Sequence, residues 1–246
     1  MKKLEWEDVA ERFVLYLDIG GFKDRVQSEK NIVELYNKLK SFRSKDKKLN
    51  PLLDGGGNSK KCFMKMAQFS DTIMVVSASN KLEDLNRITK AAVILMQIAL
   101  ETKFAIRGVV ACGEMVFDEE NQLFFGQPLV DAYLLEQQMC HYGIIFHHTA
   151  EEIVKKAVKE MRAKGRVIVV KLKNDKECYI PIDDCLIQLK SGKSKHYQVL
   201  WHKMDKELKQ GNISKEALGW LENLRTTVSG YPRAYLDNTV EFIKQN

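Results

Sequence analysis

The chain has 246 residues, of which 45% are hydrophobic and 29% are charged. These values exclude a disordered polar segment and fit a globular domain with its own core. The formal net charge of +6 favours polyanionic partners such as nucleotides, nucleic acid or anionic lipid, without choosing among them.

Cysteine spacing and hydropathy point to the cytoplasm. The five cysteines are dispersed, with no Cys-x-x-Cys pair, which argues against a zinc site and a disulfide framework. The first eight residues are too polar and acidic for a signal peptide. The longest apolar run, 91–100, is too short to cross a bilayer. We therefore expect a cytoplasmic protein with no membrane partner.

The first strand signal is the short apolar run Phe13–Leu17, which is followed by Asp-Ile-Gly-Gly. The run predicts a buried strand that ends in a tight turn at 18–21. A helix is expected after the turn. Helical spacing predicts that its apolar face contains Ile32, Leu35, Tyr36 and Leu39.

A hairpin is predicted in the next part of the chain. Residues 44–61 are rich in Lys, Asn and Gly, which is typical of a mobile loop. The stretches 62–69 and 72–77 have strand composition and meet at Ser70-Asp71. We therefore expect them to pair, with Asp71 at the tip of the hairpin.

Two further helices and a second strand pair follow. Apolar residues at helical spacing predict a helix over 82–99. The stretches 104–112 and 115–124 are expected to pair as strands around Gly113. A helix is expected from about 128 to 140.

Short strands are predicted at 143–146, 167–172 and 197–201, with a helix over 151–164. After Trp201 the pattern becomes helical. The leading order of strand, helix, strand, strand, helix, strand is that of the split βαβ arrangement in ferredoxin-like and palm domains. We therefore predict an α+β fold of the ferredoxin-like, palm-type βαββαβ kind.

The domain organisation follows from the same pattern. Residues 1–201 are expected to form the βαββαβ domain, and residues 202–246 are expected to form a C-terminal helical extension packed on its sheet.

Two aspartates are expected to meet at one edge of this sheet. Asp18 ends the first strand, Asp71 lies in the hairpin turn, and the topology places that strand beside the hairpin. Two carboxylates, with a backbone carbonyl such as that of Ile19, suit Mg²⁺ or Mn²⁺ ions that keep waters and substrate phosphates as further ligands. Each aspartate alone would be interpreted as a helix cap or a turn residue.

The turn after Asp18 predicts a phosphate site. The backbone N–H groups of Gly20, Gly21 and Phe22 are expected to point outward where a helix begins, and helix N-termini attract phosphate. Glycine also lets the backbone approach a ligand closely.

Five segments occur in the order found in class III nucleotidyl cyclases. Leu15–Phe22 resembles the first metal motif of that family, and Phe69–Val75 resembles the second. Ile106–Glu114, Phe125-Gly126 and Ala132–Glu136 are similar to its third conserved block. The resemblance implies a head-to-tail homodimer with active sites at the interface. It also implies conversion of a nucleoside triphosphate into a 3′,5′-cyclic nucleotide and pyrophosphate, with two Mn²⁺ or Mg²⁺ ions per active site.

Four positions depart from the purine cyclases of that family. Purine cyclases usually carry an Asn and an Arg on the helix of the third block, where this chain has Val130 and Leu134. Members that use ATP read adenine with a Lys and an Asp, at the positions of Ala67 and Leu123. Because apolar side chains cannot hydrogen-bond to a base edge, adenine selection by that route is not expected.

The pattern resembles instead the pyrimidine cyclases of bacterial Pycsar antiphage systems. This resemblance implies UTP, or CTP, as the substrate, cyclic UMP or cyclic CMP as the product, and a separate effector that senses the product. With the usual Asn and Arg absent, the transition state could be stabilised by Arg107, by Lys65 or by the 44–61 loop. Arg107 is the candidate catalytic residue, and we expect it to act from the partner side of the dimer.

Tyr16 lies two residues before Asp18, so both side chains share one face of a strand. We expect Tyr16 to line the nucleotide pocket, where its ring would disfavour a purine and its hydroxyl could meet a pyrimidine edge or the ribose. A core tyrosine bonded to backbone is the alternative. Two other functions remain open: a purine cyclase with unusual base recognition, and a nucleotide- or nucleic-acid-binding module without cyclase chemistry.

Overall fold

The computed structural model describes residues 6–28, 32–44, 53, 63–163, 169–171, 177–179, 182–204 and 213–245. The strands are β1 (Val9–Gly20), β2 (Met64–Phe69), β3 (Thr72–Ser77), β4 (Ala105–Asp118), β5 (Leu123–Gly126), β6 (Ile144–Phe146), β7 (Val169–Lys171), β8 (Glu177–Tyr179), β9 (Ile182–Leu189) and β10 (Gly192–Val199). The helices are α1 (Phe22–Ser28), α2 (Ile32–Ser44), α4 (Leu82–Glu101), α5 (Gln127–Glu136), α6 (His148–Ala163), the 3₁₀ turn η1 (Trp201–Met204), α8 (Ile213–Arg225) and α9 (Gly230–Gln245).

The sheet has the predicted ferredoxin-like core. Its strand order is β2-β3-β1-β4-β6-β10-β9, and β5 pairs with β4 beside this path. The first four of these strands are antiparallel neighbours. The order β2-β3-β1-β4 is that of a split βαβ unit, with α1 and α2 before β2 and with α4 before β4. The predicted α+β fold is therefore confirmed.

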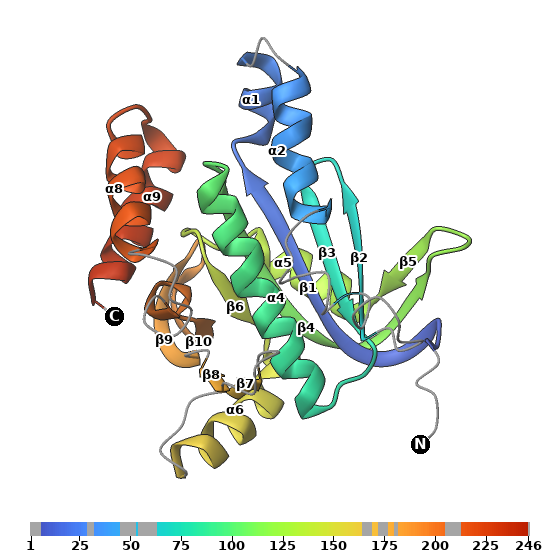
Figure 1. The fold of residues 1–246 in the computed structure, drawn as a ribbon. Coiled ribbons are helices and arrows are strands. Elements are labelled where there is room, and N and C mark those ends of the chain that lie inside the picture. The colour runs from blue at the N-terminus through green and yellow to red at the C-terminus, as the bar shows by residue number, and fades with distance from the viewer. Residues whose placement is uncertain are drawn as a thin grey trace.

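The side chains of β1 alternate between two apolar layers. Phe13, Leu15 and Leu17 belong to the main core, together with the buried residues of α4. Tyr16 points the other way and packs with Val109 and with residues of α5. Figure 1 shows α4 crossing in front of the long β1 strand, with α5 behind it. The face of the sheet that carries Tyr16 is therefore the face that α5 covers.

The predicted strand break at Gly113 is wrong. β4 runs without interruption through this residue, and Gly113 pairs with Arg12 of β1. A Cβ at Gly113 would lie 3.3 Å from Pro128, so the glycine serves close packing of α5 and does not form a turn. The reversal comes later, where the Asp118 carboxylate accepts hydrogen bonds from the backbone and side chain of Asn121 at 2.9 and 2.7 Å.

Other predicted elements need smaller corrections. Leu35 of α2 is buried as expected, but Ile32 and Tyr36 are exposed. The helix predicted over 128–140 already ends at Glu136. Sequence patterning predicted only the end of β10, within 197–201, and missed β9, where two adjacent aspartates interrupt the apolar pattern. Most of the predicted 44–61 loop lies outside the described residues.

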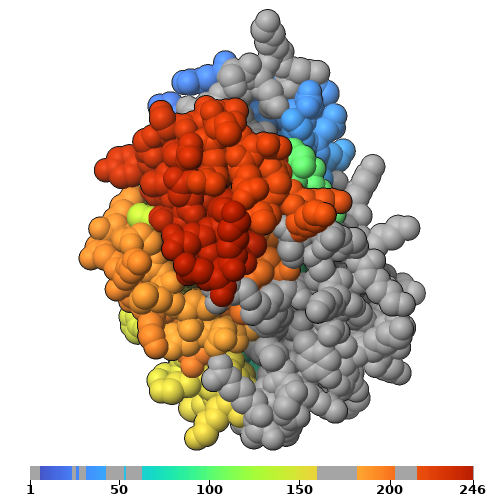
Figure 2. Space-filling model, turned by 90° about the vertical axis from the view of Figure 1, so that its left-hand side faces the viewer, coloured from blue at the N-terminus to red at the C-terminus, as the bar shows by residue number. Residues whose placement is uncertain are grey.

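The C-terminal extension forms two helices, α8 and α9, as expected. α9 is joined to the segment before β6, because Asn238 donates a hydrogen bond to the Cys140 carbonyl at 2.8 Å. In Figure 2 the two helices, in red, cover one side of the molecule above the orange β9–β10 hairpin. The division of the chain at 201/202 stays a prediction. None of the described helices combines the length and apolar character that crossing a membrane requires.

A buried histidine beneath α9 should make the fold sensitive to acid. Burial lowers the pKa of His141 to about 4, whereas an exposed histidine titrates near 6.5. Between these two pH values the unfolded chain binds more protons than the folded chain, so stability falls as pH is lowered from about 6.5. The lost free energy of unfolding reaches about 3 kcal/mol near pH 4.

Urea unfolding at pH 7 and at pH 4.5 measures this effect. We expect His141→Gln to make the free energy of unfolding less dependent on pH, with up to one proton fewer taken up on unfolding. His148→Gln, at an exposed position, should leave this pH dependence unchanged. Parallel pH profiles for the wild type and His141→Gln would show that His141 is not the responsible group.

Candidate metal and nucleotide site

Backbone pairing brings the two aspartates to one edge of the sheet. Asp18 is the register partner of Thr72 on β3 and of Arg107 on β4. Asp71 stands in the turn between β2 and β3, and its carbonyl accepts a hydrogen bond from the Ile19 N–H at 3.0 Å. The topology therefore joins Asp18, Ile19 and Asp71 across 53 residues of sequence, as the split βαβ order predicts.

Asp18 lies where a cation would be favoured. Burial raises the pKa of its carboxyl, the Arg107 charge opposes that rise, and the nearby Asp71 carboxylate adds to it. A second carboxylate close by makes ionisation of Asp18 less favourable, and a divalent cation between the two would remove that repulsion. The pair is therefore a candidate for holding a cation.

The donor set fits Mg²⁺ or Mn²⁺. Among the described residues, no group of three or more His, Cys, Asp or Glu side chains is placed to hold a metal ion. An ion bound by Asp18 and Asp71 would therefore take its remaining ligands from backbone carbonyls, water and phosphate oxygens. Such sparse protein coordination suits Mg²⁺ and Mn²⁺ at a triphosphate, and does not suit a structural zinc ion.

Arg107 is shared between two acidic side chains of its own chain. Its Nε forms an ion pair with Glu136 of α5, and its Nη2 lies 3.4 Å from the Asp18 carboxylate. The Glu136 side chain is 0% exposed. The expectation that Arg107 acts from the partner side is therefore wrong, because β4 pairs with β1 of the same chain and places Arg107 beside its own Asp18.

The turn that follows Asp18 is built around two glycines. A Cβ at Gly20 would lie 2.8 Å from the Tyr142 ring, so only glycine fits there. Gly21 has a φ of +71°, in the region that favours glycine. The Phe22 side chain packs against the main core. Phe22 can therefore offer a phosphate its backbone N–H but not its side chain. The helix that begins here, α1, is short, with 7 residues.

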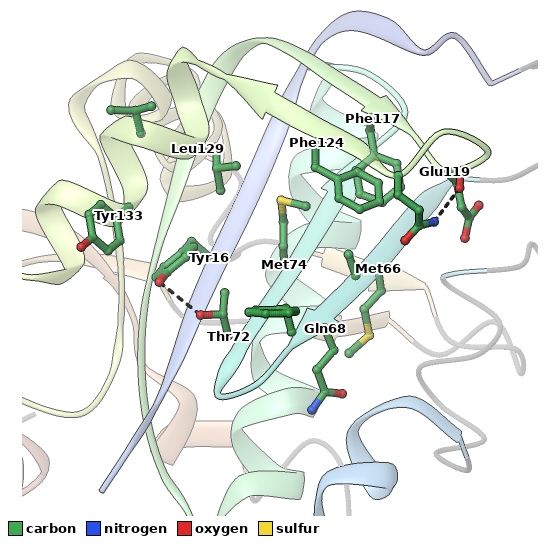
Figure 3. A pocket seen from close by; sticks show the side chains of 14 residues that line it. Tyr16, Met66, Gln68, Thr72, Met74, Phe117, Glu119, Phe124, Leu129 and Tyr133 are labelled. Carbon is green, nitrogen blue, oxygen red and sulfur yellow. Dashed lines mark hydrogen bonds between the residues drawn. The ribbon is translucent and has the colours of Figure 1, made fainter. Parts of the chain in front are cut away.

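A pocket of about 620 Å³ opens on the same face of the sheet (Figure 3). Tyr16, Met74 and Leu129 are among the residues that form its apolar wall, as labelled there. The Tyr16 hydroxyl and Thr72 Oγ1 lie 3.3 Å apart, within hydrogen-bond distance. Tyr16 therefore lines a pocket, and its hydroxyl is partnered by a side chain and not by backbone. That a nucleotide occupies this pocket stays a prediction.

Little formal charge lines this pocket. Of the described residues in its wall, Glu119 is the one charged side chain, and it pairs with Lys65 at 3.2 Å. Ala67 and Val130 both line the pocket. The wall can therefore select a base by shape, hydroxyls and amides, but it offers no free lysine or aspartate to the base.

Three residues around the site carried no predicted role. Glu136 was part of a motif, but its burial against Arg107 depends on the packing of α5 over β4. Thr72 bonds Tyr16 because the two lie on neighbouring strands, near each other across the register. Tyr235, whose ring faces Arg107, comes from α9 near the C-terminus. Only Glu136 had a sequence signal, as an acidic residue at the end of an apolar helix.

The sequence matches no known protein family and no curated protein. Among solved structures, the chain is similar to a class III adenylyl cyclase-like ATP-binding protein from Pseudomonas aeruginosa, with 17% identity and a TM-score of 0.45, over 64% of this chain and 37% of that one. It is also similar to the catalytic core of a rhodopsin-guanylyl cyclase with converted specificity, in complex with ATPαS, with 13% identity and a TM-score of 0.47, over 79% of this chain and 97% of that one. The chain spans little more than a third of the length of the Pseudomonas protein.

Proposed function

We propose that the protein is a nucleotidyl cyclase, which converts UTP, or CTP, to the 3′,5′-cyclic monophosphate and pyrophosphate. The observation that carries this proposal is the meeting of Asp18 and Asp71 at one sheet edge, on the face that holds the pocket. The ordered cyclase-like motifs support the same function. A chain that had lost the chemistry would have no use for paired metal ligands.

Asp18, Asp71 and the Ile19 carbonyl would hold two Mn²⁺ or Mg²⁺ ions. When bound, such ions lower the pKa of the ribose 3′-hydroxyl and neutralise charge on the triphosphate. The 3′-hydroxyl gives up its proton to water, its oxygen forms a bond to the α-phosphorus, the bond from that phosphorus to the bridging oxygen breaks, and pyrophosphate leaves. The backbone of the Gly20–Phe22 turn is proposed to face the phosphates. Arg107, beside Asp18, is proposed to orient that carboxylate and to offset charge that develops near it.

The pocket is proposed to receive the base. Tyr16 and Thr72 contribute hydroxyl groups, and Gln68 contributes an amide, which together can match the oxygen and nitrogen edges of a pyrimidine. Tyr16 is braced by an edge-on contact with Tyr133, with ring centroids 5.8 Å apart. A tyrosine held in this way restricts the width of the pocket, which disfavours a two-ring base. We propose UTP as the preferred substrate and CTP as the second candidate.

Removing the Tyr16 ring should change base selection. Tyr16→Ala is expected to lower kcat/KM for the preferred pyrimidine triphosphate by more than tenfold, about 1.4 kcal/mol, and to narrow the preference over ATP and GTP. Tyr16→Phe is the matched control, because it keeps the bulk that excludes purines and loses only the hydroxyl. Steady-state kinetics with all four triphosphates measure both effects. An equal fall for all four would mean that Tyr16 supports the fold or the metal site and does not read the base.

The active form is proposed to be a head-to-tail homodimer with active sites at the interface. Large apolar side chains are exposed around the pocket, among them Phe69 of the β2–β3 hairpin and Leu134 of α5. Burial of such residues is the usual driving force for association. A second copy of the chain that covers this face would also close the pocket against water.

Leu134→Glu should therefore yield a monomer with little turnover, measured by light scattering after size-exclusion chromatography and by activity. Leu186→Glu is the matched control, because Leu186 is similarly exposed (60%, against 57% for Leu134) and lies on β9, outside the pocket wall. A fully active monomer in dilute solution would contradict the proposed assembly.

The cyclic product is proposed to act on a separate effector protein in antiphage defence, from a cyclase located in the cytoplasm. No nucleic acid or membrane takes part in this proposal. A test of the activity is to incubate the protein with Mn²⁺ and each of the four triphosphates, and to identify the products by mass spectrometry. A cyclic pyrimidine monophosphate is the expected main product. A cyclic purine monophosphate would instead support a purine cyclase.

A second candidate is a nucleotide-binding module without cyclase chemistry. The observation that favours it is the apolar α5 surface, where Val130 and Leu134 are both exposed and offer no hydrogen bond to the ribose or to the transition state. Triphosphate binding without any cyclic product in the four-nucleotide incubation would select this candidate.

A further inference from the structure

The C-terminal helix α9 reaches the sheet edge that carries Asp18. The ring of Tyr235 faces the Arg107 guanidinium, whose central carbon lies 5.3 Å from the ring centroid. The same guanidinium pairs with Glu136 and with Asp18. A cation over an aromatic face is attracted to it, most strongly where both are shielded from water. Tyr235 is therefore one of three groups that restrain Arg107.

A second contact path joins α9 to the same edge. The Tyr142 N–H donates a hydrogen bond to Thr239 Oγ1 at 2.8 Å. The Tyr142 ring packs edge-on against the Tyr235 ring, with centroids 6.2 Å apart. It also occupies the space beside Gly20, where a Cβ would lie 2.8 Å from it. The extension thus touches the end of β1 through Tyr142 as well as through Arg107.

We infer that α9 contributes to the active site through Tyr235, which acts as a positioning residue for the proposed metal-binding carboxylate of Asp18. This inference rests on the proposed metal function. An unrestrained arginine and carboxylate prefer two short, parallel hydrogen bonds. Here Arg107 makes one contact of 3.4 Å with Asp18.

The restraint on Arg107 explains why this contact is single and long. Glu136 holds Nε, and the Tyr235 ring faces the guanidinium, so Arg107 cannot close fully on Asp18. The Asp18 carboxylate, which Arg107 contacts through one oxygen atom, therefore has lone pairs left for a metal ion. Without the ring, Arg107 would compete with the metal for the same oxygen atoms.

The test measures Mn²⁺ binding by the full chain with no nucleotide present. Electron paramagnetic resonance reports the concentration of free Mn²⁺ during the titration. Mn²⁺ binding at the site is defined as the fraction of total Mn²⁺ binding that is lost in Asp18→Asn. Tyr235→Leu keeps an apolar side chain but has no aromatic face, and we expect it to raise the Kd for Mn²⁺ at least fivefold. Tyr235→Phe keeps the ring but loses the hydroxyl, which also interacts with Arg107, so its Kd should lie between those of the wild type and Tyr235→Leu. Tyr231→Leu, at a residue of α9 that is 78% exposed, is the control for the helix itself.

Urea unfolding of each variant separates positioning from folding. A purely structural role would lower the urea midpoint of Tyr235→Leu and leave the Mn²⁺ affinity of the folded protein unchanged, which would overturn the inference. Thr239→Val is the second variant, because it keeps the Tyr235 side chain but removes the hydroxyl that accepts from the Tyr142 N–H and donates to the Tyr235 carbonyl. It should weaken Mn²⁺ binding at least twofold, so the inference stays testable even if Tyr235→Leu does not fold.

Failure of the inference and failure of the proposed function give different results. If Asp18-dependent Mn²⁺ binding is present and is equal in the wild type, Tyr235→Leu and Thr239→Val, the positioning role is wrong and the metal site stands. If the wild type shows no Asp18-dependent Mn²⁺ binding, both are wrong.

Discussion

Asp18→Asn and Asp71→Asn are each expected to lower the rate of cyclisation by about 1,000-fold or more, about 4 kcal/mol in the activation free energy. Asparagine has nearly the size of aspartate, so each change removes a negative charge from the metal site and leaves the packing in place. Burial raises the pKa of Asp18, the Arg107 charge opposes that rise, and the Asp71 charge adds to it. A neutral side chain at position 18 therefore avoids the cost of burying a charge, and loss of the Asp71 charge relieves a repulsion. The folded variants should therefore be no less stable than the wild type without metal.

Initial rates of cyclic nucleotide formation at saturating Mn²⁺, together with urea unfolding, measure the two halves of this prediction. Asp184→Asn is the matched control, because Asp184 is an exposed aspartate on β9 whose change should leave the rate unchanged. Near-wild-type cyclisation by either site variant would remove that aspartate from the proposed mechanism.

Among the proposed variants, Glu136→Gln should lower the free energy of unfolding the most. Glu136 is fully buried and forms the ion pair that holds Arg107. Burial raises the pKa of Glu136, and the Arg107 charge opposes that rise. Breaking a buried pair from one side leaves the other charge without full compensation, which costs about 3 kcal/mol. The free energy of unfolding in urea should fall by this amount.

An exposed ion pair provides the comparison. Glu222 and Lys244 pair at 2.7 Å across the surfaces of α8 and α9. Glu222→Gln should change stability very little, because exposed pairs are screened by water and ions. Equal effects of Glu136→Gln and Glu222→Gln would mean that the Arg107–Glu136 contact is not a stabilising element of the fold.

The sequence predicts the core topology well, because strong local patterns specify it. The apolar run before Asp18 and the hairpin around Asp71 lead to neighbouring strands β1 and β3. The helix pattern after residue 82 becomes α4, nearly as predicted. Alternation on β1 also places Tyr16 and Asp18 on one face, and Tyr16 lines the pocket there.

The contacts that tune the site could not be predicted, because they join distant segments. Register between β1 and β4 sets Arg107 beside Asp18 of the same chain, which a local motif cannot show. Gly113 has the residue type of a turn, yet it lies within a strand because α5 packs closely over it. The contact of Tyr235 with Arg107 depends on how the C-terminal helices fold back, and nothing in local spacing specifies that.

The most direct test of the metal-site proposal is anomalous scattering from crystals grown with Mn²⁺ and a non-cyclising UTP analogue. The proposal predicts two manganese peaks per site, bound by the carboxylates of Asp18 and Asp71 and by triphosphate oxygens at about 2.0–2.3 Å. The uracil ring should lie in the pocket against Tyr16. Manganese bound away from both aspartates, or a nucleotide bound without manganese at this edge, would contradict the account.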